Sequence, residues 1–122
     1  MSDIFFGLLD HSGETERHWI EEGCFIQEIL NHPEAITSLA RAWVPGRKKT
    51  RWHSVAVHEC YLIESGRGLV ELDYQAGFIV SAGDNVSIPP HTPQRICNTG
   101  DQELVLLCLC APRFTPESYQ PL

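Results

Sequence analysis

The sequence has few basic residues, no long hydrophobic run and no sustained helical periodicity. Nine Lys and Arg face 16 Asp and Glu, and the formal charge of −7 argues against nucleic-acid binding, which needs a basic surface. The longest apolar stretch, 104–111, has eight residues, whereas a membrane-spanning helix needs about 20. We therefore expect neither nucleic acid nor a membrane as a partner.

Cysteine occurs five times, an odd number, and no two cysteines have C-x-x-C spacing. This usage is typical of reduced thiols that pack as small apolar side chains. Residues 1–10 place Asp3 where a secretory signal peptide has basic residues, and their apolar run ends after six residues. Both observations predict a cytoplasmic protein.

The length fits one compact domain. A chain of this size buries roughly 65% of its unfolded surface, so it needs no disulfide or metal ion in order to fold. Composition divides it into an N-terminal extension, 1–22, a body, 23–113, and a C-terminal tail, 114–122. We expect the extension to pack onto the body as a dimer arm or a lid, and the proline-containing tail to run extended over the surface.

The body consists of short segments rich in apolar and β-branched residues, separated by turn signals such as Pro45-Gly46 and Ser65-Gly66. Only residues 32–39 could hold a helical turn. The pattern therefore predicts an all-β sandwich or barrel. The eight expected strands are 24–30, 38–44, 51–64, 68–74, 77–80, 85–88, 94–98 and 104–110.

Alternation along two of these strands brings polar residues together. Side chains two apart on a strand share a face, so His53, Glu59 and Tyr61 point the same way, among valines and an isoleucine. By the same rule Gln94 shares its face with Ile96. Apolar walls with a few converging polar groups are typical of a small-molecule pocket.

Two motifs in the body resemble those of the cupins. The first is similar to G-x5-H-x-H-x3-E-x6-G and includes His53, Glu59 and Gly66. The second is similar to G-x5-P-x-G-x2-H-x3-N and runs from Gly83 to Asn98. The resemblance covers about residues 24–113. It implies a single cupin barrel, which is a double-stranded β-helix of the jelly-roll type, preceded by an N-terminal extension.

The chain departs from the cupin pattern at the metal ligands. Val55 stands at the second histidine of the first motif, His91 at a glycine of the second, and Gln94 at the histidine of the second. Of the family's usual ligands only His53 and Glu59 remain. The resemblance thus implies a degenerate site of His53, Glu59 and Gln94 that holds one divalent ion (Zn, Fe, Mn or Ni) or none. His91 would add an imidazole only if its loop turned inward.

The same residues allow chemistry without a metal ion. His53 or Glu59 would act as the base and Tyr61 as the acid, as in sugar epimerases of the same superfamily. The structural alternative is a hydrogen-bonded His–Glu pair and a tyrosine buried in the core. These two interpretations stay open from the sequence.

Four residues are candidates for substrate contacts: Arg41, Trp43, Gln94 and His91. Sequence parity does not decide whether Arg41 and Trp43 face the pocket or a subunit contact. The basic stretch 47–51 could attract an anionic substrate or could simply be a solvated loop that balances the acidic surface.

The sequence therefore predicts a small-molecule-binding cupin with a pocket of His53, Glu59 and Gln94. In the enzyme version it is a lyase or isomerase acting on a small polar metabolite. In the alternative it is a non-catalytic ligand-binding or regulatory module without metal. A homodimer is expected because Trp19, Phe25 and Trp43 supply apolar surface. A purely structural dimer would instead have a filled barrel.

Overall fold

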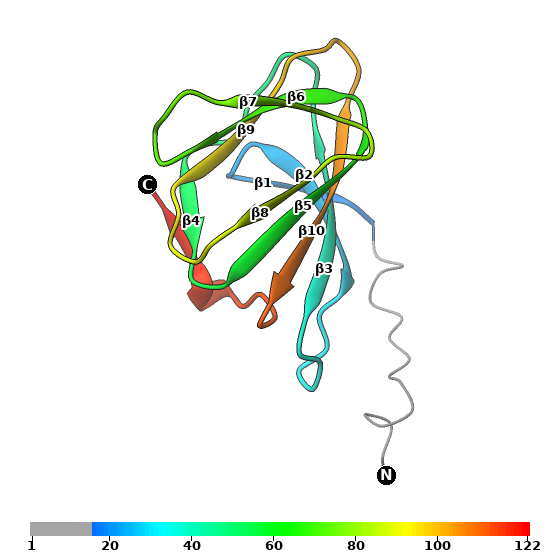
Figure 1. The fold of residues 1–122 in the computed structure, drawn as a ribbon. Helices are drawn as coiled ribbons and strands as arrows, with labels where there is room; N and C mark the ends of the chain where they lie inside the picture. The colour runs from blue at the N-terminus through cyan, green and yellow to red at the C-terminus, as the bar shows by residue number, and fades with distance from the viewer. Residues whose placement is uncertain (1–15) are drawn as a thin grey trace.

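The computed structural model describes residues 16–122, which form two facing antiparallel β-sheets around a common interior (Figure 1). Residues 1–15 of the expected extension, and with them most of the predicted arm or lid, lie outside the described residues. In chain order the strands are β1 (His18–Ile20), β2 (Cys24–Leu30), β3 (Ser38–Val44), β4 (His53–Val55), β5 (His58–Ser65), β6 (Arg67–Leu72), β7 (Phe78–Ser81), β8 (Asn85–Ile88), β9 (Gln94–Asn98), β10 (Leu104–Ala111) and β11 (Tyr119–Pro121).

The sheets have six and five strands. The first has the order β1-β2-β3-β10-β5-β8 and the second β11-β4-β9-β6-β7. The prediction of an all-β jelly-roll barrel is confirmed. Within residues 16–122 the one helical segment is a single 3-10 turn, Pro116–Ser118, and nothing there is a helix long and apolar enough to cross a membrane. Residues 32–37 of the possible helical turn are instead a turn and loop, and residues 38–39 begin β3.

The predicted strand 51–64 is two strands in different sheets. The chain bends at residues 56–57, so that β4 pairs with β9 in one sheet and β5 pairs with β10 and β8 in the other. The alternation of inward and outward side chains continues beyond the bend, as the burial of Glu59, Tyr61 and Ile63 shows. The crossing therefore brings His53 from one sheet and Glu59 from the other to the same interior.

Segments at both ends of the chain belong to the sheets. β1 pairs with β2, and β11 pairs with β4, where Tyr119 lies opposite Val55 and Pro121 opposite His53. The tail was expected to run over the surface, and its prolines argue against a central strand. An edge strand tolerates proline because one of its sides makes no ladder hydrogen bonds, and β11 is the edge of its sheet.

The barrel is filled unevenly. Aliphatic side chains from both sheets form the main core, whereas several inward positions of β2, β3 and β10 carry small residues. Small side chains cannot fill the space between two sheets, so they leave a cavity against the six-stranded sheet. These small residues are Cys24, Ser38, Ala40, Ala42, Cys108 and Cys110.

The loop at Gly46 packs tightly against the loop before β10. A Cβ atom at Gly46 would lie 2.2 Å from the carbonyl oxygen of Asp101. The backbone N–H of Arg47 also donates to the carbonyl of Gly100, at 3.0 Å. The glycine is therefore required by the close approach of two backbones.

We expect Gly46→Ala to destabilise the fold by about 2 kcal/mol, because the new methyl group has to displace backbone. The corresponding fall in Tm is about 8 °C, measured by thermal unfolding. Gly100→Ala is the matched control, since a Cβ there would lie 3.6 Å from Asn98 Oδ1, an ordinary contact. Equal Tm values for the two variants would contradict this account.

Candidate functional site

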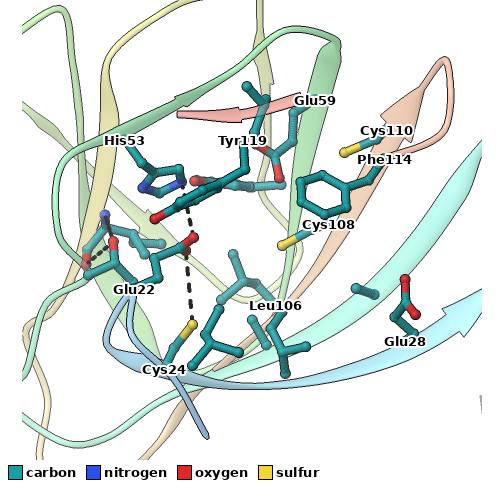
Figure 2. A pocket seen from close by; sticks show the side chains of 18 of the residues that line it. Glu22, Cys24, Glu28, His53, Glu59, Leu106, Cys108, Cys110, Phe114 and Tyr119 are labelled. Carbon is teal, nitrogen blue, oxygen red and sulfur yellow. Dashed lines mark hydrogen bonds and ion pairs between the residues drawn. The ribbon is translucent and has the colours of Figure 1, made fainter. Parts of the chain in front are cut away.

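A cavity of about 430 Å³ lies inside the barrel. Its volume falls within the range of small-molecule sites, about 300–1,000 Å³. Most of its wall is apolar, and a few ionisable side chains converge on it from β2, β4, β5, β10, β11 and the turn between β1 and β2 (Figure 2). These side chains include Glu22, Cys24, His53, Glu59, Tyr61, Cys108, Cys110 and Tyr119.

His53 is held in one tautomer. Its Nδ1 atom lies 2.8 Å from the carbonyl oxygen of Arg51, and because a carbonyl can only accept, Nδ1 carries the proton. In the neutral ring Nε2 then has the free lone pair, and it lies 3.6 Å from Glu22 Oε1. Burial lowers the pKa of His53, against smaller raising effects from the Arg51 carbonyl and Glu59. His53 is therefore arranged as a neutral base.

Tyr119 fixes the plane of the His53 ring. The two rings are stacked, with centroids 5.5 Å apart and an interplanar angle of 25° (Figure 2). Tyr119 begins β11, whose pairing with β4 places it beside His53. The tail thus contributes part of the cavity wall.

Glu59 presents an unsatisfied carboxyl group. The residue is only 7% exposed, and its Oε1 atom has no hydrogen-bond partner within residues 16–122. Burial raises its pKa to about 7, with a further increase from Glu22 and an opposing effect from His53. Near neutral pH part of this carboxyl population is therefore protonated and able to donate a proton.

Glu22 reaches the cavity from the turn between β1 and β2. Gly23, at φ 105°, lets the chain reverse there, and the backbone N–H of Arg51 donates to the Glu22 carbonyl at 2.8 Å. Burial raises the pKa of Glu22 to about 7. Sequence reasoning missed this residue because it falls in the extension 1–22. The available signal was an acidic residue directly before a glycine and the buried Cys24.

Tyr61 lines the cavity beside Glu59, and Gln94 lies behind both of them. The Tyr61 hydroxyl donates to Gln94 Oε1, and burial holds the Tyr61 pKa well above its usual value. Gln94 is fully buried but does not line the cavity. The Gln94 amide lies near Glu59 and slightly lowers the pKa of Glu59, the smallest of the effects on that carboxyl. Gln94 Nε2 and Glu59 Oε1 nevertheless form no hydrogen bond. Gln94 therefore lies next to Glu59 and behind the cavity wall.

Two of the predicted substrate contacts lie on the outer surface. Alternation on β3 turns Ala40 and Ala42 inward, so Arg41 and Trp43 point away from the cavity. Arg41 Nε forms an ion pair with Glu64 Oε1 at 2.7 Å, and the Trp43 ring is covered by the guanidinium of Arg17, 5.0 Å from its centroid. The sequence left open whether these two residues face the pocket or a subunit contact, and in the structure neither lines the cavity.

His91 also stays outside the cavity. It is exposed, it has φ 63°, and its backbone N–H donates to the Val55 carbonyl at 2.7 Å. This turn, at the position of a family glycine, directs the chain past the barrel and leaves the imidazole off the cavity wall. It therefore provides neither the predicted substrate contact nor a second imidazole.

The predicted metal set of His53, Glu59 and Gln94 does not fit an ion. Gln94 Oε1, the one ligand atom of that amide, accepts the Tyr61 hydrogen bond behind the cavity wall. Residues 16–122 contain no group of three or more His, Cys, Asp or Glu side chains arranged to hold a metal. Catalytic zinc and iron centres need about three protein ligands, and these donors fall short of that.

Comparisons with known proteins place the chain in a family. The cupin domain family matches residues 42–110, and an uncharacterized protein of Methanocaldococcus jannaschii is 39% identical over 107 residues, 84% of either chain. Among solved structures, Streptomyces Pac13 with uridine is similar with a TM-score of 0.74 and 18% identity, over 91% of this chain and 87% of that one. KdgF from Halomonas is similar with a TM-score of 0.71 and 18% identity, over 83% and 91%. The chain belongs to the cupin domain family.

Proposed function

We propose that the protein is a lyase or isomerase that uses acid–base chemistry on a small molecule bound in the barrel cavity, without a metal ion. One observation carries the proposal: His53, with a lowered pKa, and Glu59, with a pKa raised to about 7, line the same cavity. Neighbouring groups whose environments shift their pKa values in opposite directions supply a base and an acid at one pH.

The chemistry follows from which atoms are free. His53 Nε2 takes a proton from a substrate carbon, since Nδ1 already donates a hydrogen bond to the Arg51 carbonyl. In a lyase reaction the electron pair left on carbon forms a double bond, the carbon–oxygen bond breaks, and the proton of Glu59 leaves with that oxygen as water. In an isomerase the proton returns to carbon instead. The Tyr61 hydroxyl donates its hydrogen bond to Gln94 Oε1, so in this scheme Glu59 and not Tyr61 is the proton donor.

The unpaired Glu59 Oε1 favours a ligand site over a core pair. A buried polar atom without a partner costs about 1–3 kcal/mol. In a purely structural role His53 or the Gln94 amide would satisfy it. His53 instead makes its hydrogen bond to the Arg51 carbonyl and faces Glu22, and Gln94 Nε2 lies near Glu59 without forming a hydrogen bond to Oε1. A ligand hydroxyl entering the cavity would supply the missing partner.

The structural relatives support reactions of this kind. Pac13 is described as a nucleoside dehydratase. The likeness is one of fold, and it makes nucleosides a sensible part of any substrate panel together with hydroxy acids and sugars.

Turnover is tested by incubating the protein in D₂O with that panel and following product formation and deuterium uptake by NMR. We expect His53→Asn and Glu59→Gln each to lower kcat/KM for the responsive substrate by at least about 100-fold, the usual worth of a general base or acid. His58→Asn is the matched control, because His58 is exposed and bonds to Ser87 on the outside of the barrel. Full activity in His53→Asn, or tight binding with no product, would overturn the proposal.

A plot of kcat/KM against pH should fall on both the acidic and the alkaline side of its optimum. Glu59 must be protonated, and since its pKa is about 7, kcat/KM should fall about tenfold per pH unit above pH 7. His53 must be neutral, and since its pKa is lowered, the rate should fall only at pH values below the usual 6.5. A rate that keeps rising through pH 9 would contradict the assignment of Glu59 as the acid.

Metal content gives an independent test. Untagged protein purified without chelator should contain far less than one divalent ion per chain by mass spectrometry, because the donor set is incomplete. A stoichiometric ion that is lost in His53→Ala would show that the donors rearrange around a metal, and the metal-free mechanism would then be wrong.

A further inference from the structure

We infer that Arg51 binds an anionic group of the substrate, a carboxylate or a phosphate, at the mouth of the cavity. The inference rests on the proposed function and deepens it by naming the substrate class: a small molecule with a neutral body and one anionic end. Arg51 belongs to none of the sets of site residues suggested by the family motifs.

The position of Arg51 connects two hollows. It lines the inner cavity and also an outer groove of about 600 Å³. The residues common to both walls are Glu21, Glu22, Thr50 and Arg51. A ligand whose body fills the inner cavity therefore has its outer end next to Arg51.

Within residues 16–122 Arg51 also lacks an ionic partner, and among the cations that line either hollow it shares this only with Lys49 of the outer groove. Four other arginines form ion pairs, with Glu103, Glu64, Asp101 and Glu71, and Arg113 bonds to Asn31. Within the described part of the chain, the side chains of Arg51 and Arg67 make no hydrogen bond or ion pair, and Arg67 lines neither hollow. Arg51 is thus the unpaired guanidinium at the site.

The backbone of Arg51 is held on both sides. Its N–H donates to the Glu22 carbonyl at 2.8 Å, and its carbonyl accepts from His53 Nδ1 at 2.8 Å. These bonds fix the root of the side chain beside the base while leaving the guanidinium free. A side-chain substitution keeps both bonds, so it tests the charge without removing the site.

The interior has the opposite charge character. Glu22 and Glu59 both face the cavity, with no ion pair to a lysine or arginine in residues 16–122 (Figure 2). An anion placed deep in the cavity beside Glu59 would be poorly solvated by the apolar wall and would have no cation next to it. The ligand is therefore oriented, with its neutral part toward Glu59 and its anionic part toward Arg51 and the outer groove.

Matched probes test this orientation without a known substrate. The probes are 3-phenylpropionate, phenyl phosphate and the neutral 3-phenylpropan-1-ol, with Kd values from NMR chemical-shift titrations at low salt. We expect Arg51→Gln to raise the Kd of at least one anion about tenfold and to leave that of the alcohol within about twofold. The anion with the larger loss identifies carboxylate or phosphate as the preferred group.

Arg67→Gln is the control, and it should change none of the Kd values. Unchanged anion binding in Arg51→Gln, an equal loss for the alcohol, or no binding of any probe to the wild type would each overturn the inference. A Tm equal to that of the wild type confirms that Arg51→Gln is folded. His53→Asn should lose turnover and still bind the anion. Retained turnover in His53→Asn would count against the proposed chemistry, whereas unchanged anion binding in Arg51→Gln would count against the Arg51 site. The two proposals can therefore fail separately.

Discussion

The hydrogen bond from His53 Nδ1 to the Arg51 carbonyl is the interaction on which the site depends. It fixes the tautomer, and so it leaves the lone pair of Nε2 available near Glu22. The backbone N–H of Arg51 donates to the Glu22 carbonyl, and this bond anchors the turn between β1 and β2 to the segment before β4. One backbone segment thus sets the base, the second carboxyl and the free guanidinium at the mouth of the cavity.

Burial away from water shifts the pKa values of the ionisable groups in the cavity. Small inward residues on β2, β3 and β10 leave an apolar cavity, and the carboxyls that face it lose most of their hydration. Burial is the largest cause of the raised pKa values of Glu22 and Glu59 and of the lowered pKa of His53. The cavity that admits a ligand is therefore also what separates an acid from a base.

Several features could be predicted from local pattern. The period of two along residues 59–63 and 94–98 assigned Glu59, Tyr61 and Gln94 to the interior, and all three are buried. The turn residues marked most strand ends, and the two motifs indicated the cupin barrel. Each of these features depends on residues close together in the chain, where side-chain direction follows from backbone geometry.

By itself the sequence determined the all-β class, the family and the inward direction of His53 and Glu59. Only the tertiary structure decided what surrounds them, because pairing between distant segments sets it. Register with β10 and β2 turned Arg41 and Trp43 outward, and the short strands at the chain ends brought Glu22 and Tyr119 to His53. Gln94 faces inward as alternation requires, yet Tyr61 and Glu59 lie between it and the cavity, a depth that no one-dimensional pattern encodes.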